Sequence, residues 1–156
     1  MRSAFVPLFC AIGLVVSGRI GTPAAGGPSE GNDELQGAWT IESSVTGGIE
    51  IPPGDLKGFI LTVEGDKHIL KKGDEVIQVG TQKLDPSTSP KAIDVTVTEG
   101  PNKGPVMLGI YELDGDTLTV CFDPRGKMRP TEFKSAPGSE HVVNVHKRVN
   151  HDHDRQ

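Results

Sequence analysis

The chain has 156 residues, of which 35% are hydrophobic and 24% are charged, and this balance is typical of one soluble globular domain. Its net charge of −5, without a cluster of lysine and arginine interleaved with aromatic residues, argues against binding to nucleic acid. Its 20 glycines and 12 prolines fall mainly between short β-rich runs, which favours sheets over helices.

The first 25 residues have the pattern of a secretory signal peptide. Arg2 supplies a short positive region, residues 4–16 are mostly apolar, and residues 22–25 offer small side chains for cleavage. The apolar run is about 13 residues, short of the ~20 that a membrane-spanning helix needs, so a permanent anchor is the weaker alternative. Phe9 precedes Cys10, which argues against acylation there. We therefore expect an exported chain, in the periplasm or outside the cell, without stable membrane insertion after cleavage.

Cleavage would change both the charge and the cysteine content of the chain. It removes two of the 16 basic residues and none of the 21 acidic ones, so the net charge becomes −7. It also removes Cys10, which leaves Cys121 unable to form an internal disulfide, and we expect Cys121 to be a small hydrophobic residue on a strand. Residues 26–33, rich in glycine, proline, serine and acids, are interpreted as a flexible linker.

Residues 34–148 form the predicted domain. Segments rich in β-branched residues recur at short intervals with turn residues between them, which is the pattern of an antiparallel meander. Tight turns are predicted at Gly65, Gly73 and Gly115, and residues 53–57 have helical character for one turn at most. The expected strands are residues 37–45, 58–64, 67–71, 75–83, 92–98, 106–113, 117–122, 131–135 and 141–148. The predicted fold class is all-β, a meander that closes into a small barrel of about eight or nine strands.

Alternation along these strands predicts an interior that mixes apolar and polar side chains. A barrel of about eight strands has an interior just wide enough to be filled by side chains or to hold one small ligand. His68 and Gln82 are both predicted to point inward. An unpartnered buried polar group costs about 1–3 kcal/mol, so we expect these two to bond to each other or to trapped water rather than to a ligand.

Several motifs resemble one known family. They are LQGAW at residues 35–39, LDPSTSPKAID at 84–94, EGPNKG at 99–104 and LGIYELDGDTL at 108–118, continued by RPTEF at 129–133 and PGS at 137–139. Together they resemble the lipocalin-like domain of unknown function that is expanded in planctomycetes, over about residues 34–148. The resemblance implies a lipocalin-like barrel and export, but it supplies no ligand or catalytic residue. His68 and Gln82 depart from the family's apolar or aromatic pattern. Gly37 and Trp39 are also similar to the Gly-x-Trp of true lipocalins, whose tryptophan plugs one end of the barrel.

The first functional hypothesis is a binding module without catalytic residues or cofactor. The ligand would be a small amphiphilic molecule, with aromatic residues lining the cavity and a basic loop at its mouth that meets an anionic head group. A barrel with no cavity above about 100 Å³ would contradict this hypothesis. The candidate ligand-binding residues are Trp39, Phe59, His68, Gln82, Tyr111, Phe122, Arg125 and Arg129.

Two further hypotheses stay open. One is a solid-core structural or interaction module of the cell envelope. The other is an enzyme, which would need a polar cluster such as His68 and Gln82 with a carboxylate. The only cluster of residue types that commonly bind metal ions lies near the C-terminus, where histidines 146, 151 and 153 accompany aspartates 152 and 154. We interpret residues 149–156 as a disordered polar tail without a specific metal site, because a mobile tail loses entropy when it encloses an ion.

Overall fold

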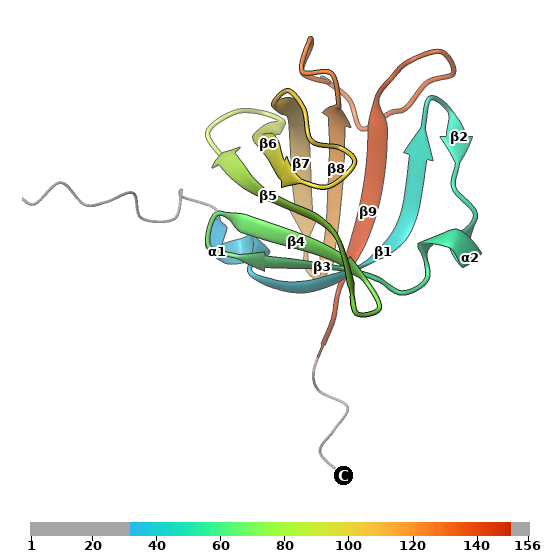
Figure 1. Cartoon of the computed structure of the whole chain (residues 1–156). Helices are drawn as coiled ribbons and strands as arrows, with labels where there is room; N and C mark the ends of the chain where they lie inside the picture. The colour runs from blue at the N-terminus through green and yellow to red at the C-terminus, as the bar shows by residue number, and fades with distance from the viewer. Residues whose placement is uncertain (1–31, 151–156) are drawn as a thin grey trace, which may run out of the picture.

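Nine strands form one antiparallel sheet in the computed structural model, which describes residues 32–150 (Figure 1). Consecutive strands from β3 to β9 are neighbours, as in a meander, and β1 pairs with both β3 and β9. The elements are α1 (Asn32–Leu35), β1 (Gly37–Thr46), β2 (Ile49–Glu50), α2 (Pro53–Leu56), β3 (Phe59–Glu64), β4 (Lys67–Lys72), β5 (Glu75–Asp85), β6 (Lys91–Glu99), β7 (Met107–Asp114), β8 (Thr117–Asp123) and β9 (Val142–Arg148). Within residues 32–150, no helix is long and apolar enough to cross a membrane.

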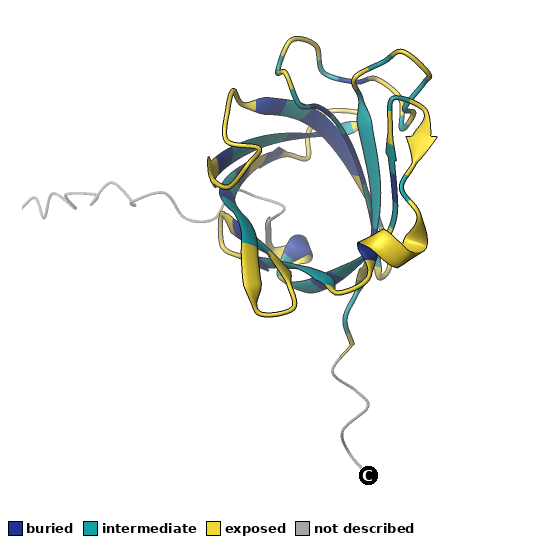
Figure 2. Cartoon of the chain, turned by 45° about the vertical axis from the view of Figure 1, so that its right-hand side comes forward, coloured by how far each residue is buried: buried dark blue, intermediate teal, exposed yellow. Residues whose placement is uncertain are grey.

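The pairing of β1 with β9 closes the sheet into a barrel of eight strands, which confirms the predicted fold class. Figure 2 shows the strands as a closed ring. The first residues of β1 pair with β3, and most of its length pairs with β9. A register shift between Ile41 and Ser43 allows β1 to bend from one partner to the other. The short β2 pairs only with the end of β1 and lies outside the ring.

Three Gly-Asp turns set the register of the barrel. Gly65, Gly73 and Gly115 have φ values of 57°, 61° and 57°, which glycine adopts without steric cost. Each glycine is the first of two residues between paired strand ends, as between Glu64 and Lys67. These turns confirm the predicted hairpins, and those at Gly65 and Gly115 fix which side chains of β3, β4, β7 and β8 point inward. In β5 a register shift opposite Leu70 and Lys71 follows the Gly73 turn, and it also helps to set the direction of the side chains beyond it.

Residues 131–135 do not form the predicted strand. They belong to the long connection between β8 and β9, which starts with a turn around Asp123. The Asp123 carboxylate accepts hydrogen bonds from the backbone N–H groups of Arg125, Lys127 and Met128, at 2.9, 3.0 and 3.0 Å. Burial raises the pKa of Asp123, but these three hydrogen bonds outweigh it, so its pKa is lowered.

Two other elements were not predicted. α1 begins at Asn32, inside the segment interpreted as a linker, and β2 lies between two expected strands, where no strand was predicted. The turn of helix expected at residues 53–57 is present as α2. Cys121 is a fully buried strand residue, as predicted, and its Sγ lies 3.8 Å from the Lys134 carbonyl oxygen.

The hydrophobic core fills one end of the barrel. Trp39 and Tyr111 are among its most buried side chains, and Leu35 brings α1 into the same cluster. The other members of this core are Val63, Leu84, Ile93, Leu118 and Val120. Five of these eight core residues also line the cavity described next: Leu35, Val63, Ile93, Leu118 and Val120.

Candidate functional site

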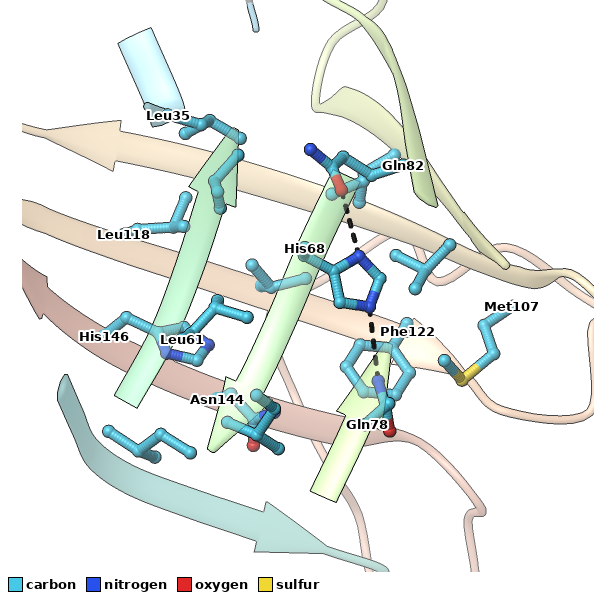
Figure 3. Close-up of a pocket in the computed structure, with 16 residues that line it drawn as sticks. Leu35, Leu61, His68, Gln78, Gln82, Met107, Leu118, Phe122, Asn144 and His146 are labelled. Atoms are coloured by element: carbon cyan, nitrogen blue, oxygen red, sulfur yellow. Dashed lines mark hydrogen bonds between the residues drawn. The ribbon is translucent and has the colours of Figure 1, made fainter. Parts of the chain in front are cut away.

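A cavity of about 130 Å³ lies inside the barrel (Figure 3). At the end near α1, the lining residues Leu35 and Leu118 are buried. At the other end Leu70, Gln78 and Asn144 are partly exposed, so the cavity opens toward solvent there. Most of the wall is apolar, and no aspartate, glutamate, lysine or arginine lines it. The lining residues are Leu35, Ile41, Leu61, Val63, His68, Leu70, Gln78, Gln82, Ile93, Val95, Met107, Leu118, Val120, Phe122, Asn144 and His146.

Trp39 and Arg148 close the end of the barrel at α1. The Trp39 indole N–H donates to the Leu35 carbonyl oxygen at 2.9 Å, and the Arg148 guanidinium lies 4.2 Å from the centre of the Trp39 ring. Arg148 also donates to the carbonyl oxygens of Gln36 and Glu34, at 2.7 and 2.8 Å. The cation–π contact and these hydrogen bonds tie α1 to β1 and β9. This places Trp39 at a closed barrel end, where the Gly-x-Trp resemblance implies it.

His68 is the centre of a hydrogen-bonded chain on the β4–β5 wall (Figure 3). Its Nδ1 lies 3.0 Å from Gln82 Oε1, and its Nε2 lies 3.3 Å from Gln78 Nε2. An amide oxygen only accepts and an amide nitrogen only donates, so His68 is neutral with its proton on Nδ1. The chain continues from Gln82 Nε2 to the Gly65 carbonyl oxygen at 3.3 Å, and from Asn102 Nδ2 to Gln78 Oε1 at 3.0 Å.

Gly80 makes room for this imidazole. It pairs with His68 across β4 and β5, and a Cβ at this position would lie 2.6 Å from a carbon of the His68 ring and 2.3 Å from the Thr96 carbonyl oxygen. No side chain larger than hydrogen fits there without displacing the ring or the strand. Burial lowers the pKa of His68, and the hydrogen bond with Gln82 only partly opposes this, so the neutral form is favoured.

The β9 wall carries polar atoms without partners. Asn144 Oδ1 and His146 Nδ1 are both buried, and neither makes a hydrogen bond. His146 is 5% exposed, and complete burial lowers its pKa to about 4, although a backbone hydrogen bond with Thr40 opposes the shift. His146 is therefore neutral at pH 7. Its neighbours across the sheet, Ile41 and Leu118, are apolar.

The structure brings three of the eight predicted binding residues together on the cavity wall: His68, Gln82 and Phe122. Trp39, Phe59 and Tyr111 were expected to line the cavity and do not. Trp39 and Tyr111 are instead packed into the hydrophobic core. Phe59 is the first residue of β3, and the Lys72 ammonium lies over its ring, 4.9 Å from the ring centre.

The two predicted arginines also do not line the cavity. Ile93 and Val95 line it, so Asp94 between them faces outward, and Arg129 Nη2 bonds to Asp94 Oδ1 at 2.7 Å. Arg129 Nη1 donates to the carbonyl oxygens of Ile93 and Gly109, at 3.2 and 2.7 Å, which fastens the β8–β9 connection to the outer wall. Arg125 pairs with Glu140. The expected cationic mouth is therefore replaced by arginines paired with carboxylates away from the cavity.

Gln78, Asn144 and His146 line the cavity but were not among the predicted site residues. Alternation along residues 75–83 places Gln78 on the same face as Gln82, and alternation along residues 141–148 could have found the other two. In the sequence, His146 stands out only as a member of the C-terminal histidine group. The rest of that group lies outside residues 32–150, and within the described part no three histidine, cysteine or acidic residues are placed to hold a metal ion.

Wider hollows lie on the outer surface, but they are less suited to hold a molecule. One of about 620 Å³ is lined by Thr81, Lys83, Asp94 and Thr96, with Asp66, Gln82 and Val106. These side chains are mostly those of the outward face, and the hollow is broadly open to solvent. The internal cavity is smaller and opens to solvent on one side, but it lies inside the closed barrel and its wall is mostly apolar, which suits it better to an apolar molecule.

Comparisons with protein-family models, with curated proteins and with solved structures find no match to this chain.

Proposed function

We propose that this chain is an exported lipocalin-like protein that binds a small, mostly apolar molecule inside its barrel. The observation that carries this proposal is the cavity of about 130 Å³ in the closed barrel, with a largely apolar wall and one side open to solvent. A preformed apolar hollow with a few polar groups is the usual form of a ligand site. The resemblance to a lipocalin-like family and the N-terminal sequence of residues 1–25 support the barrel and the export parts of the proposal.

The size of the cavity limits the ligand. It exceeds the limit of about 100 Å³ below which binding would be contradicted, but drug-sized ligands occupy about 300 Å³ or more. An engineered apolar cavity of about 150 Å³ in another protein binds benzene. The ligand of this chain is therefore of the size of a single substituted ring, much smaller than a fatty acid.

A binding role is better supported than the two alternatives. The enzyme hypothesis called for a carboxylate beside His68 and Gln82, and the third member of their cluster is the amide of Gln78. The solid-core hypothesis called for a filled barrel, and about 130 Å³ of this one is not filled. A negative net charge and the absence of any charged residue on the cavity wall fit neither nucleic acid nor a charged substrate.

Toluene is a suitable first ligand, because it matches the size and polarity of the cavity. Titration followed by NMR should show saturable shifts of backbone amides on β8, the strand that bears Leu118 and Val120. In the variant Val120→Phe the added ring fills the cavity, and toluene binding should be lost. Thr119→Phe places the same ring on the outer face of β8, because Thr119 alternates with the two lining residues, and should leave binding unchanged.

Failure of the folded wild-type chain to bind toluene, benzene or xenon would contradict the proposed function. So would equal binding to both phenylalanine variants. Export is tested separately by intact mass spectrometry of the chain recovered from its own cells. The expected mass lacks about the first 25 residues, and a full-length mass would contradict export.

A further inference from the structure

The polar atoms of the cavity wall are not all equivalent. On the β4–β5 wall, both ring nitrogens of His68 and the Gln82 oxygen that faces the ring have partners within the protein. On β9, Asn144 Oδ1 and His146 Nδ1 have none. An unpartnered buried polar atom costs free energy that a hydrogen bond would recover. A ligand group that forms a hydrogen bond on the β9 side therefore gains more binding free energy than a group that must first break the hydrogen bonds of His68.

The unpartnered atoms specify the kind of group that fits. The amide oxygen of Asn144 accepts hydrogen bonds and cannot donate them. His146 lies two residues along the strand on the same face, about 6.6 Å away by strand geometry, and lines the same cavity. A ligand needs a hydrogen-bond donor, such as a hydroxyl or N–H group, to satisfy Asn144. The apolar residues across from this pair, among them Ile41, Leu118 and Val120, enclose the rest of the molecule.

The charge of the ligand follows from the same wall. No acidic or basic side chain lines the cavity, and both histidines are held neutral by burial. A charged ligand would lose its hydration without gaining a counter-charge, which costs several kcal/mol in such surroundings. The predicted anionic head group accordingly has no binding partner here, and a neutral molecule is favoured.

We propose that the cavity selects small neutral molecules that combine one apolar ring or chain with one hydrogen-bond donor, as phenol does, and that Asn144 beside His146 accepts that donor. This specificity rests on the proposed function and adds to it the chemical class of the ligand and the wall that recognises it.

Phenol and toluene test the proposal, because they differ mainly by a hydroxyl in place of a methyl group. The quantity to measure is the ratio of the toluene Kd to the phenol Kd, obtained by calorimetry or NMR titration on the full chain. Loss of the acceptor in Asn144→Leu should lower this ratio by roughly tenfold, the factor expected from one hydrogen bond to an otherwise unpartnered group. The control Val145→Leu changes β9 between Asn144 and His146, at a position that alternates to the outer face and does not line the cavity, and should leave the ratio unchanged.

A second readout does not depend on the variants folding. The ring ¹⁵N shifts of His146 in the wild-type chain should respond more to phenol than to toluene, while those of His68 should respond to both alike. If both ligands bind and neither the ratio nor the His146 shifts distinguish them, the proposed specificity is wrong and the proposed function stands. If the folded chain binds neither ligand, both are overturned.

Discussion

Two walls of one barrel each present a buried histidine with amide side chains nearby, and the two arrangements differ. His68, on β4, bonds through both ring nitrogens to Gln82 and Gln78, and the chain of bonds continues to the backbone. His146, on β9, has an unpartnered Nδ1, and the amide oxygen of nearby Asn144 is unpartnered too. Burial lowers the pKa of both histidines, so charge does not distinguish them.

The difference indicates which polar groups maintain the fold and which are available to a ligand. Every hydrogen bond of the His68 chain is made within the protein, so removing its centre leaves other buried groups without partners. Removing His146 takes away its unpartnered Nδ1 and costs only one hydrogen bond, the one with the Thr40 backbone. The same substitution on the two walls should therefore have very different effects on stability.

The largest effect is expected for His68→Leu. This change leaves Gln82 Oε1 without its partner in the interior and removes the bond to the half-buried Gln78. At about 1–3 kcal/mol for each group left unpaired, the free energy of unfolding should fall by about 3 kcal/mol. Urea denaturation at pH 7.5 measures it. His141→Leu, outside the barrel strands, is the control and should change stability by less than about 0.5 kcal/mol. A loss below about 1 kcal/mol for His68→Leu would show that the hydrogen bonds around His68 do not stabilise the fold.

Acid should destabilise the chain through His146. Its pKa is about 4 in the folded protein, against the ordinary histidine pKa of 6.5 that applies to the unfolded chain. Above pH 6.5 both states are neutral, and as the pH falls toward 4 the unfolded chain takes up the proton first, so stability is lost across that window. The loss between pH 7.5 and 4.5 should be about 2–3 kcal/mol. The His68 shift acts in the same direction, so the measured quantity is the difference in pH dependence between wild type and His146→Leu. Parallel curves would contradict the pKa shift.

Local patterns in the sequence predicted most of the barrel. The Gly-Asp turns and the alternation of strands β3 to β8 are set by neighbouring residues, and they placed His68 and Gln82 on one face in advance. Residues 131–135 also alternate, but β8 is already paired with β7 and β9, so neither side of the preceding strand is free to pair with them. The sequence cannot reveal this kind of competition without the whole topology.

The candidate site was less predictable, because it depends on contacts distant in sequence. Arg129 was expected to meet a ligand, but its partner Asp94 lies 35 residues away along the chain. Trp39 and Tyr111 were expected around the cavity because they point inward, yet α1 fills that end of the barrel and packs against them. Alternation gives the direction of a side chain, but it does not show how far along the barrel axis the packing continues.

The smallest effect is expected for His146→Leu at pH 7.5, where neither state of the histidine is protonated. The variant loses the unpartnered Nδ1 and the hydrogen bond with the Thr40 backbone. It gains an apolar side chain of similar size among Ile41, Leu61 and Leu118, which also line the cavity. Its free energy of unfolding should stay within about 1 kcal/mol of wild type, because the penalty of the unpartnered nitrogen disappears and offsets the lost hydrogen bond with Thr40. The same urea titration measures it. A loss as large as that of His68→Leu would mean that His146 Nδ1 also has a partner in the folded protein, such as trapped water, and the two walls would then be equivalent.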